Sequence, residues 1–186
     1  DYVGPNNMSA GRLLAAHLAE LGATSLAFLG GTHGVSARLE RLRGLREQWK
    51  KEGMTWQADL AIASNAREPG GREAVRLLLE RGPLPDAIVG YSDTVVRGIF
   101  SQLKDEGIQP GRDVAVAGID DDPTAVHLHP ELTSVATHME IVGHEALRLL
   151  LDRISNPARE SVTKLISSSL TVRESTAAWK GRRGSS

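Results

Sequence analysis

The chain has 186 residues, with 22 lysine and arginine residues against 23 aspartate and glutamate residues, and it contains no cysteine. The net charge of −1 gives no overall attraction to nucleic acid or an anionic membrane, and the lack of cysteine excludes disulfides, thiolate zinc sites and thiol nucleophiles. No apolar run reaches the roughly 20 residues that span a bilayer, and the first residues lack a signal-peptide pattern. We therefore expect a soluble, cytoplasmic protein, although a mature secreted form would have the same composition.

Alternating helices and strands are predicted along most of the chain. The first residues, Asp1 to Val3, resemble the end of a strand already under way, so we expect a fragment. Apolar periodicity, caps and glycine stops predict helices over 10–21, 35–52, 71–81 and 94–106, and strands over 25–30, 58–62, 86–91 and 113–118. Strands that are continuous apolar runs between helices are typical of a parallel sheet covered on both faces. The predicted fold class is therefore α/β, with a doubly wound parallel sheet.

The pattern changes after Pro130. A short extended piece over 132–136 is followed by a predicted helix over 139–154 and an extended stretch over 162–172. The last residues, from Trp179, have no apolar periodicity and are rich in glycine, serine and arginine, so we expect them to stay outside the fold.

Ligands of open parallel sheets bind beyond the carboxyl ends of the strands, so the residues that follow each predicted strand are the candidates for a site. They are Gly30 to Gly34, Ser64 to Arg67, Ser92 with Asp93, and Asp120 to Asp122. The glycine-rich turn either cradles a phosphate or is a tight turn that needs positive φ, and it matches no nucleotide-binding fingerprint.

The acidic candidates each have a structural alternative. Asp93 opens a predicted helix, so it is either a helix cap or a ligand contact. Asp120 to Asp122 either form turns before Pro123, face a ligand, or hold a divalent cation. On periodicity alone Arg41 belongs to a solvated, charged helix face with its neighbour Arg38.

The motifs taken together resemble the lactose/galactose repressor family of bacterial transcription regulators. The similarity runs over residues 3–176 and depends on a combination of pieces in order: Ala27 to Gly31, Arg41-x-x-Gly44, Pro85 to Asp93, Asp113 to Asp121, Pro130 to Val135, Gly143-x-x-Ala146 and Leu170 to Ser175.

The resemblance implies a domain organisation. Members carry an N-terminal helix-turn-helix and a two-lobed effector domain like the periplasmic sugar-binding proteins. The chain is then expected to hold the second effector-binding lobe over 7–131, late-crossing elements of the first lobe over 132–166, a return strand to the second lobe over 167–176, and a disordered tail over 177–186. The DNA-binding module and the early first lobe are expected to be absent, and a homodimer is implied because relatives dimerise through these lobes.

The resemblance also implies roles for the candidates. Arg41 matches an arginine that reaches the ligand from its helix, and Asp120 matches an aspartate that binds sugar hydroxyls. Ser92 stands where relatives commonly have asparagine, and Asp93 follows it as the expected cap beside the ligand. Asp121 and Asp122 are expected to provide turn and hinge polarity.

Three more positions are candidate ligand contacts, and the resemblance implies two of them. Thr137 and Met139 fall at cleft-facing positions of a crossing between the lobes. Asn65 lies near the place where several sugar-binding relatives have an aromatic ring that stacks on the ligand, and this sequence has none there. A hexose stacked from this side is therefore in doubt.

The predicted function is a non-enzymatic sensor, the effector half of a repressor that binds a small polar metabolite, with a sugar as the expected class, without metal or cofactor. A periplasmic sugar-binding protein of a transport system is the first alternative, because it shares the fold. A doubly wound enzyme that uses Asp93 and Asp120 with a metal is the second.

Overall fold

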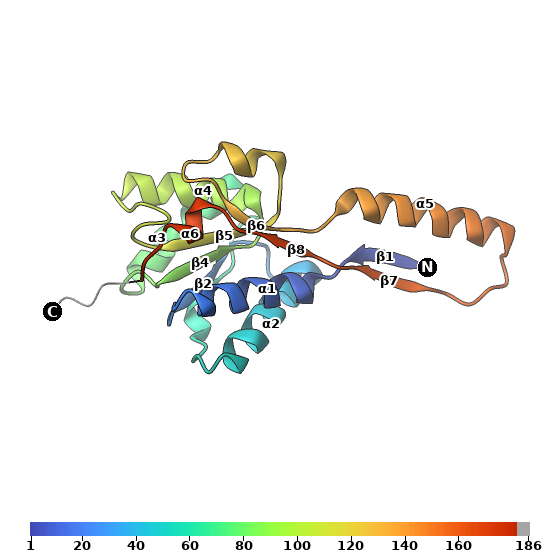
Figure 1. Ribbon diagram of the computed structural model, residues 1–186, viewed down its shortest axis with the longest axis horizontal. Coiled ribbons are helices and arrows are strands. Elements are labelled where there is room, and N and C mark those ends of the chain that lie inside the picture. Colours follow the sequence, from blue (N-terminus) through green and yellow to red (C-terminus); the bar gives the residue numbers. More distant parts are fainter. Residues whose placement is uncertain (182–186) are drawn as a thin grey trace.

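The structure is a computed structural model and describes residues 1–181 (Figure 1). The α-helices are α1 (Asn7–Glu20), α2 (Ser36–Lys51), α3 (Glu68–Glu80), α4 (Asp93–Asp105), α5 (Met139–Ser155) and α6 (Glu174–Ala177), and 3₁₀ turns are η1 (Ala58–Leu60) and η2 (Pro123–His127). The strands are β1 (Tyr2–Pro5), β2 (Leu26–Leu29), β3 (Ala61–Ile62), β4 (Ala87–Gly90), β5 (Ala115–Asp120), β6 (Thr133–Ala136), β7 (Thr163–Ile166) and β8 (Ser169–Thr171).

Six strands form the large sheet, in the order β3-β2-β4-β5-β6-β8, and all of its pairs are parallel except β6 with β8. Helices α1 and α2 cover one face of this sheet, and α3 and α4 cover the other (Figure 1). The prediction of a doubly wound α/β fold is confirmed. Strands β1 and β7 form a second, two-stranded parallel sheet, which extends away from the large one together with α5 (Figure 1).

The central strands β2 and β4 are apolar throughout because both of their faces are buried. In β2, Ala27 and Leu29 pack towards α3 and α4, whereas Leu26 and Phe28 pack towards α1 and α2. All four side chains are at most 2% exposed. Successive side chains of a strand point to opposite faces, so one short strand supports two separate cores.

Two glycines allow α1 and α2 to approach closely. A Cβ on Gly11 would lie 2.1 Å from the carbonyl oxygen of Arg41, and a Cβ on Gly44 would lie 2.1 Å from that of Met8. The pattern Arg41-x-x-Gly44 thus has a physical reason: Gly44 lets α2 press against α1, and this contact fixes where Arg41 begins its reach towards the sheet.

The structure corrects two predicted elements. The strand predicted over 58–62 is mostly the η1 turn, and only Ala61 and Ile62 pair with β2. The extended piece at 132–136 was assigned to the first lobe, but β6 pairs in parallel with β5 and therefore belongs to the large sheet. The boundary predicted at residue 132 is placed too early, and the chain leaves the large sheet only after Ala136.

The disordered tail predicted over 177–186 starts too early, because its first residues belong to the fold. Helix α6 ends at Ala177, and Trp179 is 4% exposed and packs into the core on the α1 side of the sheet. The indole buries a large apolar area, which outweighs the polar composition around it. Residues 182–186 lie outside the described part of the chain.

Helix α5 contacts little of the protein. It packs beside β1, and only Val142 and Leu149 are buried along its 17 residues. Although α5 is the longest described helix, none of the helices within residues 1–181 has the length and apolar character needed to cross a membrane.

Candidate functional site

The candidate site lies at the edge of the large sheet where β2, β4 and β5 end. Asp120 is the last residue of β5, and Arg41 reaches this edge from the middle of α2. The Arg41 Nη2 atom donates to the Asp120 Oδ1 atom over 3.0 Å. The two residues are 79 positions apart, and the fold brings these two implied ligand residues into direct contact.

Three hydrogen bonds and the aromatic ring of Tyr91 hold the Arg41 guanidinium in place. Besides the bond to Asp120, its Nε donates to Asn7 Oδ1 over 2.9 Å and its Nη1 donates to the Tyr91 carbonyl oxygen over 2.6 Å. The guanidinium lies 4.9 Å from the centre of the Tyr91 ring. Its side chain is only 7% exposed. A buried cation needs such partners, and together they give Arg41 one fixed direction.

Asp120 is the exposed partner of this pair. Its side chain is 40% exposed, so the carboxylate faces outward while Arg41 lies beneath it. Partial burial raises the pKa of Asp120, and the charge of Arg41 opposes that rise. The backbone of Asp120 has a φ of +120°, which non-glycine residues rarely adopt. Such conformations cost on the order of 1–3 kcal/mol and concentrate at functional sites.

Asp93 does not have the role of helix cap that was expected. The cap of α4 is Ser92, whose Oγ accepts from the Val95 backbone N–H over 3.4 Å. Asp93 is 1% exposed, and its carboxylate accepts from the Ser134 hydroxyl over 2.7 Å and from the Asp122 backbone N–H over 2.8 Å. Burial raises the pKa of Asp93 to about 7. This carboxylate therefore points into the protein and ties α4 to β6.

The two aspartates after Asp120 bind other parts of the chain. Asp121 accepts from the Thr171 hydroxyl over 3.1 Å and pairs with Arg173 over 2.8 Å, which joins the end of β5 to β8. Asp122 caps η2, because its carboxylate accepts from the Thr124 backbone N–H over 2.8 Å. The contacts agree with the turn and hinge roles expected for these two residues.

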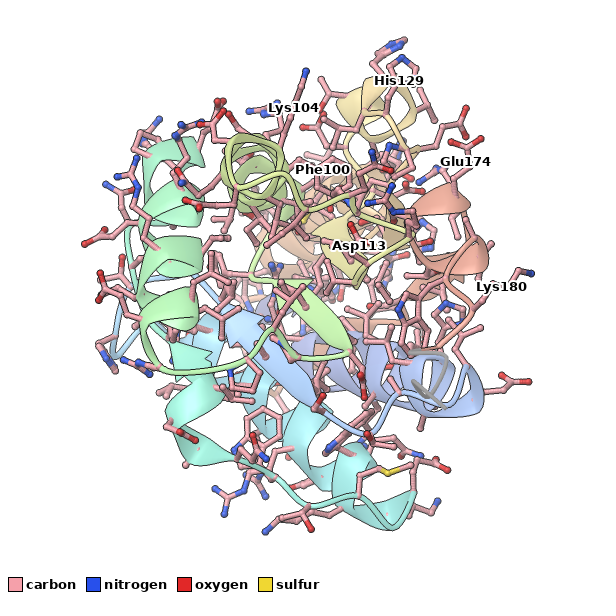
Figure 2. The ribbon with its side chains drawn as sticks, turned by 90° about the vertical axis from the view of Figure 1, so that its left-hand side faces the viewer. Phe100, Lys104, Asp113, His129, Glu174 and Lys180 are labelled. Carbon is pink, nitrogen blue, oxygen red and sulfur yellow. The ribbon has the colours of Figure 1, made fainter. Side chains whose placement is uncertain are left out.

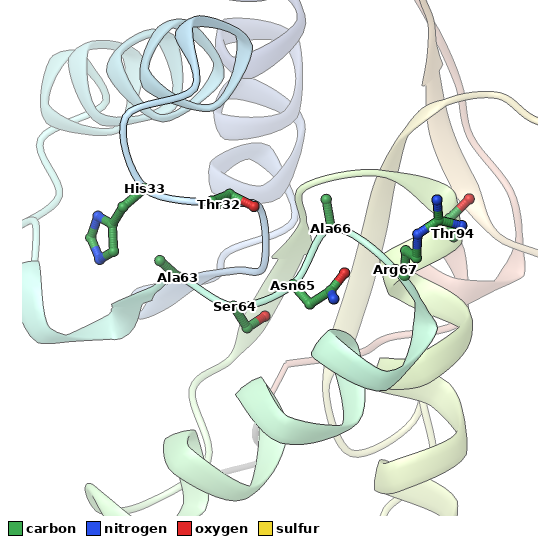
Figure 3. Close-up of a pocket in the computed structure, with 8 residues that line it drawn as sticks. All are labelled: Thr32, His33, Ala63, Ser64, Asn65, Ala66, Arg67 and Thr94. Carbon is green, nitrogen blue, oxygen red and sulfur yellow. The ribbon is translucent and has the colours of Figure 1, made fainter.

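An open groove continues along the same edge of the sheet, over the ends of β2 and β3 (Figure 3). It has a volume of about 680 Å³ and is lined by Thr32, His33, Ala63, Ser64, Asn65, Ala66, Arg67 and Thr94. The predicted contact Asn65 therefore lies in a groove at the rim. The imidazole of His33 is the one ring among these eight residues, in keeping with the lack of an aromatic residue noted beside Asn65.

Thr137 and Met139 lie on the segment that leaves the large sheet towards α5. Thr137 is 1% exposed, and its hydroxyl is buried without a hydrogen-bond partner. Met139, at the start of α5, is 57% exposed. Neither residue lines the groove or contacts the Arg41–Asp120 pair by a hydrogen bond or ion pair that the structure shows.

Sequence reasoning missed three residues around the pair. Asn7 and Tyr91 were not singled out, although both bind the Arg41 guanidinium. Arg38 was assigned to a solvated face but is 2% exposed, donates to the Gly30 carbonyl oxygen and lies over the Phe28 ring. Arg38, Arg41 and Leu45 recur at helical spacing on one buried face of α2, and this periodicity was the available signal.

Metal ligation has no preformed site in residues 1–181. No group of three or more histidine, aspartate or glutamate side chains in that range is arranged to hold a metal ion. The aspartates at the rim are instead engaged by arginine, serine, threonine and backbone donors.

Sequence comparison relates this chain to proteins that are already known. Residues 15–176 match the model of the family described as periplasmic binding protein-like domain. The HTH-type transcriptional regulator CelR of Thermobifida fusca is 36% identical over 174 residues, which cover 94% of this chain and 51% of CelR. The regulator GalR of Escherichia coli strain K12 is 28% identical over 163 residues, covering 88% of this chain and 48% of GalR. The chain thus spans about half the length of the curated relatives it matches.

The structural comparison agrees. The structure of a transcriptional regulator CelR–cellobiose complex superimposes with a TM-score of 0.89 at 36% identity, covering 94% of this chain and 54% of that one.

Proposed function

We propose that this chain, which belongs to the periplasmic binding protein-like domain family, is the effector-sensing part of a transcription regulator and binds a small sugar at its rim. The observation that carries the proposal is the pair of Arg41, buried and fixed, and Asp120, half-exposed at the end of β5. In open parallel sheets this edge is where ligands bind, and the matched relatives are transcription regulators.

The chemistry of the rim suits a sugar. A carboxylate and a guanidinium can each engage two neighbouring hydroxyls through charge-assisted hydrogen bonds. Ser64, Asn65 and Thr94 add neutral polar groups along the groove. The similar CelR structure is a complex with cellobiose, which supports a saccharide as the effector class. Ser92, Asp93, Thr137 and Met139 lie on the segments that border the proposed site, and the buried Asp93 carboxylate supports it from within the protein.

Effector binding would act through the position of the two sheets. A sugar held between the large sheet and a further lobe favours one angle between them, and this angle sets the spacing of attached DNA-binding modules. Only a difference in affinity between the two arrangements can transmit the signal, typically 1–3 kcal/mol. The full regulator would act as a cytoplasmic homodimer that binds DNA through a helix-turn-helix outside this chain.

A sugar-binding protein of a transport system is the alternative that shares this fold. The matched relatives favour the regulator, because CelR and GalR are both transcription regulators. The complete gene discriminates the two: a regulator encodes a helix-turn-helix before this region, whereas a transport protein encodes an export signal.

The test is calorimetric titration of the complete gene product with cellobiose, glucose, galactose and ribose. We expect one of these sugars to bind and Asp120→Ala to weaken its binding at least tenfold, with DNA binding retained. The matched control is Asp113→Ala, just before the other end of β5, where Asp113 pairs with Arg112 (Figure 2). Unchanged affinity in Asp120→Ala, or an equal loss in Asp113→Ala, would refute a site at this rim.

A further inference from the structure

Asn7 contacts two successive residues of α2. Its Oδ1 accepts from Arg41 Nε over 2.9 Å, and its Nδ2 donates to Glu40 Oε2 over 3.1 Å. Asn7 is 6% exposed, whereas Glu40 is exposed. The Asn7 amide therefore connects the first residue of α1 to the helix that carries Arg41.

Asn7 follows directly after the place where the chain crosses between the two sheets (Figure 1). Pro5, the last residue of β1, pairs with Ile166 of β7, and the Asn6 N–H donates to the Ile166 carbonyl oxygen over 2.9 Å. A change in the angle between the sheets must be taken up at this crossing, one residue away from the contact with Arg41.

The geometry of Arg41 makes this contact directional. A guanidinium is planar and rigid, so fixing two of its nitrogens fixes the direction of the third. Asn7 holds Nε and the Tyr91 carbonyl oxygen holds Nη1, which leaves Nη2 aimed at Asp120. Without the Asn7 acceptor, one of these two fixed points is lost.

We propose that Asn7 is a positioning residue of the effector site, which holds Arg41 in line with Asp120 and ties the first crossing between the sheets to the rim. This inference builds on the proposed function. An effector that moves Asp120 displaces Arg41, and Arg41 transmits the displacement to Asn7 and so to the crossing strand β1.

The other two crossings are tied to the same acidic turn. The second crossing leaves the large sheet after β6, where Ser134 donates to Asp93, and Asp93 accepts from the Asp122 backbone N–H. The third crossing returns through β8, where Thr171 donates to Asp121. The three consecutive aspartates after Ile119 are therefore tied, taken together, to all three crossings, and Asn7 completes the connection to the first.

The first test needs no ligand. The titration midpoint of the Asp120 carboxylate, measured by carbon NMR on the chain, reports whether Arg41 stays beside it. Arg41, Asp122 and Asp93 are the charged groups that face Asp120, and only Arg41 lowers its pKa. We expect Asn7→Leu and Asn7→Ala to raise the midpoint by about half a pH unit or more, since each removes the acceptor that holds Arg41.

The control is Glu40→Gln, which removes the charge from the other partner of Asn7 and should leave the Asp120 midpoint unchanged. In the double variant Asn7→Leu with Arg41→Met, the midpoint should equal that of Arg41→Met alone, because Asn7 acts through Arg41. The inference is overturned if both Asn7 variants keep the wild-type Asp120 midpoint. It is also overturned if Glu40→Gln shifts that midpoint as much as the Asn7 variants do.

The second test uses cellobiose and the complete gene product. We expect about tenfold weaker binding in Asn7→Leu and wild-type affinity in Glu40→Gln. If the midpoint moves but the wild type binds none of the four sugars of the calorimetric titration, the positioning role stands and the proposed function fails. If sugar binds equally to the wild type and to Asn7→Leu and the midpoint is unmoved, the proposed function stands and the positioning role fails.

Discussion

The two regions of this chain bury their apolar residues to very different extents. In the region built on the large sheet, helices α1 and α4 place leucines such as Leu14, Leu18 and Leu103 at 0% exposure. In the region formed by β1, β7 and α5, the leucines Leu147, Leu150 and Leu151 are 56–57% exposed. Helix α5 thus has apolar side chains around more of its circumference than the two-stranded sheet can cover.

The difference shows what each region depends on. The large sheet has helices on both faces and two closed cores, so its stability comes from contacts within residues 1–181. The small region has one helix against two strands, and most of the apolar side chains of that helix stay exposed. We expect mutations of equal chemistry to have unequal effects in the two regions.

Truncation of a buried leucine should have the largest effect. Leu103→Ala in α4 should lower the free energy of unfolding by about 2–5 kcal/mol, because it leaves a cavity in a closed core. Leu150→Ala in α5 should change it by less than about 0.5 kcal/mol, because that side chain is already exposed. Urea denaturation of both variants measures the contrast, and equal losses would show that the comparison is wrong.

The pH dependence of stability should come next and should run in opposite senses in the two regions. The pKa of Asp93 is raised to about 7, so the folded state binds a proton more tightly than the unfolded state between pH 4 and 7. This contribution is present at low pH and is lost as the pH rises towards 7, on the order of 4 kcal/mol in total.

Comparison with Asp93→Asn isolates this contribution. The unfolding free energy of the wild type minus that of Asp93→Asn should fall steadily as the pH rises from 4 to 7. In α5, Lys164 and Arg148 lower the pKa of Glu145, so its stabilisation is instead lost as pH falls. A difference between wild type and Asp93→Asn that stays constant across this range would contradict a titrating Asp93.

Glycine-to-alanine substitutions should have smaller effects, destabilising in the large-sheet region and stabilising in α5. Gly44→Ala should destabilise the protein by about 1–3 kcal/mol, because its Cβ would meet the Met8 carbonyl oxygen at 2.1 Å. Gly143→Ala, within α5, has no atom within 4 Å and should stabilise by about 0.5–1 kcal/mol through higher helix propensity. Thermal denaturation checks both signs, and a stabilising Gly44→Ala would refute the close helix contact.

The elements of the large sheet could be predicted from the sequence because each carries a local signal. Helix α1 has leucines at helical spacing and a glycine stop, and β2 and β4 are short apolar runs between turns. The meeting of Arg41 and Asp120 followed from the family resemblance and from the rule that strand ends share one edge of a sheet.

What could not be predicted depends on contacts distant in sequence. Nothing within 132–136 indicates which strand β6 pairs with, and the polar residues around Trp179 hide the core position of its ring. Asn7 carries the composition of a helix cap, whereas its contact with Arg41 exists only because α1 and α2 pack closely. Side chains that connect one element to another have no local periodicity to reveal them.

The most direct test of the central claim is a crystal structure of the complete gene product grown with a sugar that binds it. The account predicts sugar hydroxyls about 3 Å from the Asp120 carboxylate and from the Arg41 guanidinium. A sugar held by the Thr32 and Asn65 groove alone, with no contact to Asp120 or Arg41, would contradict it.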